Sequence, residues 1–112
     1  MESLRALFFM VILLIGTSFW ANTITICSDC EVKSVSEGVA QAADFDTLLI
    51  KKGTYKEFNI LINKSLTLIG ENYPTIDGED KGEIIRIVSD NVTIDGLFII
   101  NVGTSYTTDY AA

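Results

Sequence analysis

The chain has no histidine, one proline, one tryptophan and two cysteines among its 112 residues. Without histidine, it cannot by itself build Ser-His-Asp or Cys-His nucleophile systems, or metal sites based on imidazole. It has 8 basic and 15 acidic residues, which gives a formal charge of −7. An acidic domain with no cluster of lysine or arginine is repelled by phosphate backbones, so the sequence argues against nucleic-acid binding.

The N-terminus has the layout of an export signal. A short segment containing Arg5 precedes the apolar run Ala6–Ile15, and small or polar residues follow it. This order predicts a signal peptide over residues 1–21, cleaved after Ser18 or Ala21. The apolar run is shorter than the roughly 20 residues of a transmembrane helix. An uncleaved N-terminal anchor is the alternative, and either way we expect the domain outside the cytoplasm.

Two segments repeat the same short phrase, Ser65-Leu-Thr-Leu-Ile-Gly70 and Asn91-Val-Thr-Ile-Asp-Gly96, and a half-phrase, Pro74-Thr-Ile-Asp-Gly78, lies between them. In each, apolar residues alternate with polar ones and a glycine ends the run. Such a recurrence indicates one coil stacked on another. The sequence therefore predicts an all-β fold, a right-handed parallel β-helix (solenoid). A small β-sandwich is the competing fold.

Short β-rich segments with Gly, Asn or Asp at their joints fill most of the chain after residue 22. The expected strands are 23–27, 46–50, 58–62, 65–69, 74–76, 83–88, 92–94 and 97–100, with a turn at 52–55. Alternation predicts inward-pointing and outward-pointing positions. We expect Val92, Ile94, Leu97 and Ile99 to point into the coil, and Thr93 and Asp95 to point outward.

A short amphipathic helix is expected before the coils. Ser34 and Glu37 match a capping box, and apolar residues share one face of Val35–Ala43. The helix would cover the N-terminal end of the solenoid, as terminal caps do. The expected organisation is a signal peptide at 1–21, a strand and capping helix at 22–45, and the first coils of a β-helix at 46–112. We expect these coils to be open at the C-terminal end, as the N-terminal part of a longer protein.

Four stretches occur in an order and spacing that is similar to one known family. They are Cys27-Ser-Asp-Cys-Glu-Val-Lys-Ser34, Asp46-Thr-Leu-Leu-Ile-Lys-Lys-Gly-Thr-Tyr-Lys-Glu57, Leu68-Ile-Gly-Glu-Asn-Tyr-Pro-Thr-Ile-Asp-Gly78 and Asn91-Val-Thr-Ile-Asp-Gly-Leu-Phe-Ile-Ile-Asn-Val-Gly103. From about Thr23 onward the chain resembles the periplasmic NosD family, and it covers only the opening part of such a protein. Two departures are Phe45, where the family has glycine, and Gly38, in the expected helix.

The resemblance implies a periplasmic accessory protein that is not an enzyme. Such a protein helps to assemble the copper-sulfur centre of nitrous-oxide reductase and does not reduce nitrous oxide itself. The implied partners are ABC transporter subunits, a copper chaperone and nitrous-oxide reductase, with the membrane reached only through the transporter. The alternative function is a polysaccharide-binding or lyase-type β-helix, because the Gly-Thr-Tyr and Ile-Asp-Gly phrases also occur in pectate-lyase-like proteins.

Cys27 and Cys30 are the only pair of soft metal ligands. Two thiolates suit Cu(I), with a partner completing the site. Outside the cytoplasm the same pair can form a structural or redox-active disulfide. Lipid attachment or an inert pair also remain open. Copper is thus a possible ligand, and no cofactor is predicted with certainty.

Other motifs have a structural interpretation beside a functional one. Six carboxylates invite a calcium or glycosidase hypothesis, but most stand in turns, where Asp forms local hydrogen bonds. They are Asp77, Glu79, Asp80, Glu83, Asp90 and Asp95. Two glycosylation sequons begin at Asn63 and Asn91. Four tyrosines could stack on sugars but are expected as outward turn residues: Tyr55, Tyr73, Tyr106 and Tyr110.

Overall fold

The computed structural model describes residues 21–103, so the predicted signal peptide lies outside the described residues except for Ala21. The elements within this range follow one another in chain order. They are β1 (Thr23–Ile26), α2 (Val35–Gln41), β2 (Thr47–Ile50), β3 (Thr54–Lys56), β4 (Ile60–Ile62), β5 (Thr67–Gly70), β6 (Thr75–Asp77), β7 (Ile85–Ile87), β8 (Thr93–Asp95) and β9 (Phe98–Ile100). Within this range no helix is long and apolar enough to cross a membrane.

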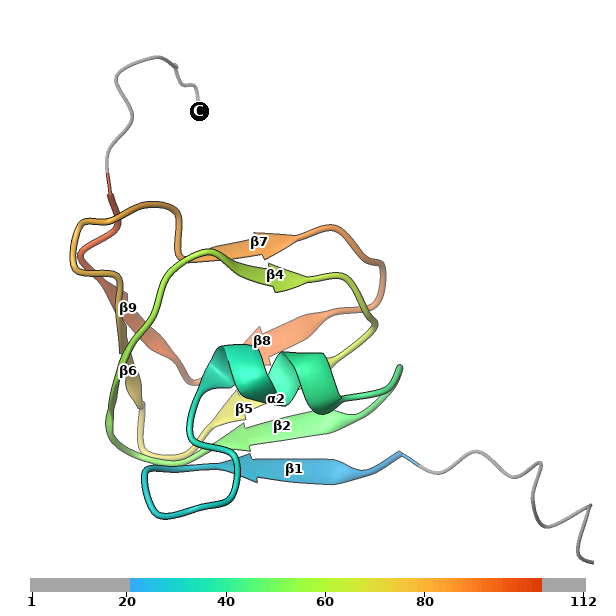
Figure 1. Cartoon of the computed structure of the whole chain (residues 1–112). Helices are drawn as coiled ribbons and strands as arrows, with labels where there is room; N and C mark the ends of the chain where they lie inside the picture. The colour runs from blue at the N-terminus through green and yellow to red at the C-terminus, as the bar shows by residue number, and fades with distance from the viewer. Residues whose placement is uncertain (1–20, 104–112) are drawn as a thin grey trace, which may run out of the picture.

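The strands form three parallel sheets that the chain visits in turn. The sheet orders are β1-β2-β5-β8, β3-β6-β9 and β4-β7, and every pairing is parallel. Seen from its N-terminal end, the chain turns clockwise as it recedes from the viewer (Figure 1), which is the right-handed sense. The predicted right-handed parallel β-helix is confirmed, and the sandwich is excluded because every strand pairing is parallel.

The repeated phrases lie directly above one another. Ser65–Gly70 contains β5 and Asn91–Gly96 contains β8, and Leu68 is the register partner of Ile94. The half-phrase at 74–78 supplies β6 instead, in a different sheet. Gly70 is required by this stacking, because a Cβ there would collide with the backbone of Gly96. The glycine that ends each phrase therefore lets two coils approach closely.

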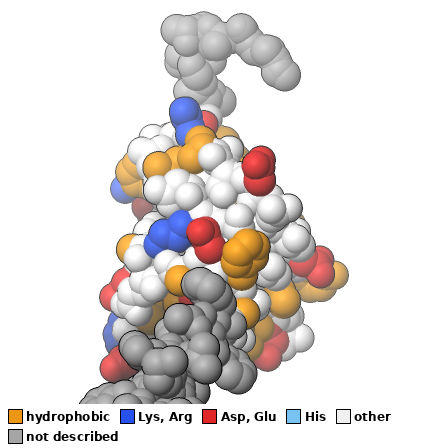
Figure 2. Space-filling model, turned by 90° about the vertical axis from the view of Figure 1, so that its right-hand side faces the viewer, with side chains coloured by type: hydrophobic (Ala, Val, Ile, Leu, Met, Phe, Trp, Pro, Cys, Tyr) orange, Lys and Arg blue, Asp and Glu red, His pale blue; other side chains and the backbone are white. Residues whose placement is uncertain are grey.

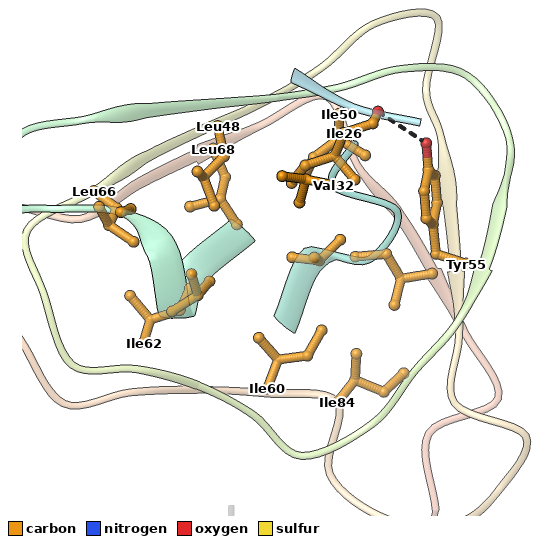
Figure 3. Close-up of a cluster of buried hydrophobic side chains, with 14 residues drawn as sticks. Ile26, Val32, Leu48, Ile50, Tyr55, Ile60, Ile62, Leu66, Leu68 and Ile84 are labelled. Atoms are coloured by element: carbon orange, nitrogen blue, oxygen red, sulfur yellow. Dashed lines mark hydrogen bonds between the residues drawn. The ribbon is translucent and has the colours of Figure 1, made fainter. Parts of the chain in front are cut away.

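Inward-facing aliphatic side chains fill the space between the three sheets (Figure 3). β2 and β4 each contribute two alternate residues, as the predicted period of two requires. The buried cluster comprises Ile26, Val32, Val35, Val39, Ala42, Leu48, Ile50, Tyr55, Ile60, Ile62, Leu66, Leu68, Ile76 and Ile84. Val92, Ile94 and Leu97 pack against it and are partly buried, while Thr93 and Asp95 are exposed. The inward and outward assignment around β8 is confirmed.

Two apolar residues of the last described coil are more exposed than their register partners one coil earlier. Ile87 pairs with Ile62, and their exposed fractions are 47% and 0%. Ile99 pairs with Ile76, and theirs are 40% and 0%. In both of these inward columns, therefore, one residue is fully buried and its partner in the last described coil is partly exposed.

The helix α2 lies over the N-terminal end of the solenoid and contacts β1, β2 and β4 (Figure 1). Ser34 is its N-cap, with its side chain accepting from the Glu37 N–H at 3.0 Å. The Glu37 carboxylate accepts from Lys33 N–H, one residue before the position a capping box predicts. The helix ends at Gln41, two residues earlier than expected, because the backbone at Ala42 is already extended.

The expected turn at 52–55 is partly wrong, because Thr54–Lys56 form β3 and pair with β6. A three-residue strand beside a glycine carries little periodic signal of its own. Its partner lies 21 residues further along the chain, where Thr54 aligns with Thr75. Only the stacking of coils therefore reveals this strand.

Candidate functional site

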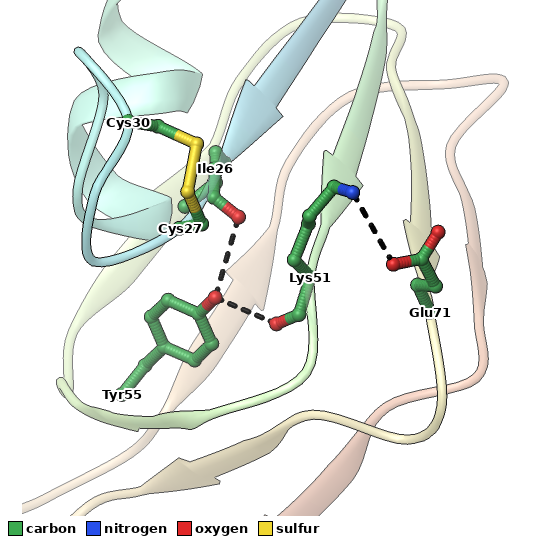
Figure 4. Close-up of polar contacts among 6 residues, drawn as sticks. All are labelled: Ile26, Cys27, Cys30, Lys51, Tyr55 and Glu71. Carbon is green, nitrogen blue, oxygen red and sulfur yellow. Dashed lines mark hydrogen bonds and ion pairs between the residues drawn. A yellow bond between two sulfur atoms is a disulfide. The ribbon is translucent and has the colours of Figure 1, made fainter.

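Cys27 and Cys30 lie in the turn that follows β1, and a disulfide joins them (Figure 4). Their Cα atoms are 5.0 Å apart. The turn is closed by hydrogen bonds from Cys30 N–H to Cys27 O and from Cys27 N–H to Val32 O, both 3.2 Å long. Both cysteines are half-buried, and Ser28 and Asp29 between them are exposed.

Tyr55 anchors this turn to the next coil. Its hydroxyl donates to Lys51 O at 2.6 Å and to Ile26 O, immediately before Cys27, at 3.3 Å (Figure 4). Burial raises the pKa of the Tyr55 phenol, and the nearby Glu57 carboxylate adds to the rise. The expectation that Tyr55 points outward is wrong, because only 7% of it is exposed. Tyr73 is exposed as expected, and Tyr106 and Tyr110 lie outside the described residues.

The disulfide form offers no thiolate to a metal. Within residues 21–103 no three His, Cys, Asp or Glu side chains gather closely enough to hold an ion. Reduction would free two sulfur ligands, and the neighbouring acidic residues in the sequence, Asp29 and Glu31, are hard carboxylates that suit Cu(I) poorly. A Cu(I) site at Cys27 and Cys30 would therefore need reduction and a further ligand from a partner. The metal role of these cysteines stays a prediction.

Two of the six carboxylates, Asp77 and Glu83, form hydrogen bonds at the corners of the coils. Asp77 accepts from the Asn101 side chain and from Glu79 N–H, each at 2.9 Å, and these two bonds, the first being the stronger cause, lower its pKa. Glu83 pairs with Arg86, with 2.7 Å between Oε2 and Nε. The sequon residues Asn63 and Asn91 are both exposed.

A shallow groove of about 360 Å³ lies on the outer side of β4 and β7. Its lining is Asn59, Ile60, Leu61, Glu83 and Arg86. The sequence analysis does not predict this groove, because it places Leu61 in the expected strand at 58–62 without assigning its side chain to the outer face. The available signal was three consecutive apolar residues at 60–62: with period two, the middle one must point outward.

The side of the molecule in Figure 2 mixes all side-chain types. Acidic and basic side chains are interspersed there with apolar ones. One exposed ion pair within the described residues joins neighbouring coils, between Lys51 Nζ and Glu71 Oε1 at 3.5 Å. Such exposed pairs contribute little to stability.

Comparisons with family models, with curated proteins and with solved structures gave no match. The likeness to the NosD family therefore rests on the residue stretches quoted above. The β-helix fold rests on the parallel strand pairings.

Proposed function

We propose that this chain is an exported, non-enzymatic accessory protein for maturation of the copper centre of nitrous-oxide reductase, acting in the periplasm with an ABC transporter. The ordered NosD-like phrases from Cys27 to Gly103 carry this proposal. The parallel β-helix is compatible with it, because stacked coils present long regular surfaces that suit docking of several partners. Those partners are the transporter subunits, a copper chaperone and the reductase.

The disulfide turn is the part of the chain that copper would contact. A dithiol partner would reduce the Cys27–Cys30 bond by two electrons and two protons and would itself become a disulfide. The two thiols lose their protons when Cu(I) binds, and a partner supplies the remaining ligand. Copper is thus a passing cargo and not a resident cofactor. The place of both cysteines in a turn whose other residues, Ser28 and Asp29, are exposed supports such a transfer.

Deletion of the gene in the source organism tests the proposal. We expect the reductase to accumulate without its copper-sulfur centre, and complementation with the intact chain to restore the copper content. A deletion strain with a fully loaded reductase would refute the proposed function.

The cysteine role is tested separately by complementation with the double variant Cys27→Ser/Cys30→Ser. The matched control is Ser28→Ala, in the same turn. Titration of the reduced protein with Cu(I) against a competing chelator gives the direct measurement. Equal copper binding by the double variant and the control would remove these cysteines from the proposal and leave the scaffold role standing.

A further inference from the structure

The sequence contains two Asp-Gly pairs, Asp77-Gly78 and Asp95-Gly96, at the ends of β6 and β8. In such a pair the backbone nitrogen of the glycine can attack Cγ of the aspartate, because glycine has no Cβ to shield its amide. A succinimide ring forms and a water molecule leaves. The reaction needs a carboxyl group that can turn back towards the backbone and an amide that is free to approach it. The two pairs differ in both respects.

The Asp77-Gly78 pair is held by hydrogen bonds on both reacting groups. The Asp77 carboxylate accepts from the Asn101 side chain and from Glu79 N–H, each at 2.9 Å. The buried Gly78 donates its N–H to Ile100 O at 3.0 Å. The strand β6 itself lies between β3 and β9 in its sheet. Attack within this pair requires these bonds to break together, so we expect the fold to suppress it.

The Asp95-Gly96 pair has neither restraint within residues 21–103. The Asp95 side chain is exposed, and no ion pair or side-chain hydrogen bond engages it in this range. The Gly96 N–H has no acceptor among the same residues. The strand β8 is the outermost described strand of its sheet and pairs with β5 alone (Figure 1). Small local openings at this edge are therefore enough to bring the two reacting groups together.

We propose that Asp95-Gly96 is a site of spontaneous backbone isomerisation, at which aspartate becomes isoaspartate while Asp77-Gly78 stays intact. The Gly96 nitrogen forms a bond to Asp95 Cγ, and its proton leaves with the carboxyl hydroxyl as water. A second water molecule then opens the ring at either carbonyl. Opening at the former main-chain carbonyl leaves the backbone running through Cγ. The atoms balance without an oxidant, a reductant or an enzyme.

The product changes the corner at which two coils approach closely. Isoaspartate adds one carbon atom to the main chain between β8 and β9, and Gly96 lies directly against Gly70. We expect the added carbon to shift β9 against its register partner β6 and to loosen the last described coil. The disulfide turn follows β1 at the other end of the same sheet, so this inference is independent of the proposed role in copper maturation.

Incubation of the full purified chain at physiological pH and temperature, followed by digestion with trypsin, tests the proposal. Cleavage after Lys64, Lys81 and Arg86 places the two pairs in separate peptides, 65–81 and 87–112. Labelled methyl transfer by a protein isoaspartyl methyltransferase measures isoaspartate in each peptide. We expect it to accumulate about tenfold or more faster in 87–112 than in 65–81. Equal rates, faster modification of 65–81, or no modification of 87–112 would overturn the proposal.

Two variants within the same peptide locate the reaction. Asp95→Glu should abolish methyl transfer to 87–112, because glutamate would have to close a larger ring that forms more slowly. The matched control is Asp90→Glu, also at an exposed position, which should leave the modification unchanged. In urea, where the fold protects neither pair, both peptides should be modified at similar rates. Modification of 87–112 that persists in Asp95→Glu, or a 65–81 peptide that stays slow in urea, would also overturn the proposal.

Discussion

Glu57 and Lys64, on either side of β4, hold opposite ends of α2. The Glu57 carboxylate accepts from the N–H groups of Val35 and Ser36, at 2.7 and 2.9 Å. The Lys64 ammonium donates to Val39 O and Ala42 O, at 2.8 and 2.7 Å. An acid at the N-terminus and a base at the C-terminus complement the helix dipole and bind backbone groups that lack helical partners. The residues that flank β4 thereby hold α2 in place over the N-terminal end of the solenoid.

Replacing Lys64 with Met should lower the free energy of unfolding by about 1–3 kcal/mol, because the C-terminal carbonyls of α2 lose a charged donor. Hydrogen exchange should show the α2 amides opening first. The exposed Lys52→Met is the control and should stay within about 0.5 kcal/mol of the native chain. Equal effects of the two substitutions would show that Lys64 does not hold the C-terminal end of α2.

Gly38 is the second test of the cap. Alanine is a better helix former by about 1 kcal/mol, yet a Cβ at Gly38 would lie 2.6 Å from Ile26 Cδ1 in the core. We expect Gly38→Ala to destabilise by about 1–2 kcal/mol in urea unfolding, because overpacking outweighs propensity. The exposed Ala40→Gly reports propensity alone. A stabilising Gly38→Ala would show that α2 does not pack as closely as described.

Leu68 and Ile94 occupy the same inward column, one coil apart. Leu68→Ala should cost about 2–5 kcal/mol, as for a fully buried leucine. Ile94→Ala should cost less, because Ile94 is only partly buried. The outward Thr93→Asp should lie within about 0.5 kcal/mol of the native chain, and Ile94→Asp should cost clearly more. Urea midpoints compare the variants within each pair. An Ile94→Ala as costly as Leu68→Ala, or a Thr93→Asp as costly as Ile94→Asp, would contradict the register.

Asp46 is the buried carboxylate among the described residues. It accepts from the Ala43 and Asn22 N–H groups, each at 2.9 Å, and these bonds, Ala43 first, hold its pKa below the ordinary value, with a smaller effect of Lys64. A lowered pKa stabilises the fold above the unfolded pKa of about 3.9, and this contribution is lost as pH falls through the folded value. Urea midpoints below pH 4 should therefore drop more steeply for the native chain than for Asp46→Asn. Parallel curves would contradict this.

Tyr55→Phe should cost about 1 kcal/mol, because the hydroxyl bonds to Lys51 O and Ile26 O are lost while the ring still fills its place. Tyr73→Phe, at an exposed position, should have no measurable effect on thermal unfolding. The same Tyr55 variant should make the Cys27–Cys30 disulfide react faster with a thiol reagent, because the turn has lost its anchor. An unchanged reaction rate would show that Tyr55 does not hold the turn.

The sequence by itself determined the fold class and the place of most strands. Period-two alternation fixes which side chains enter the core, and the glycines that end the repeated phrases mark where coils must approach closely. The helix was also readable, because Ser34 and the apolar face of Val35 and Val39 are local signals. Phe45 shows a limit of the sequence analysis. Its φ of 73° lies in the left-handed region, which favours glycine. No local pattern predicts that a phenylalanine adopts this conformation.

Only the tertiary structure decided the contacts between coils. β3 exists because β6 lies beside it, Tyr55 is buried because Ile26 and Lys51 offer carbonyls, and Glu57 and Lys64 reach a helix more than twenty residues earlier in the chain. Gly38 is needed in α2 because a Cβ there would lie too close to Ile26. These are long-range relationships between a side chain and the backbone or core of another coil. No local period or composition encodes them, because they depend on which residues the stacking places side by side.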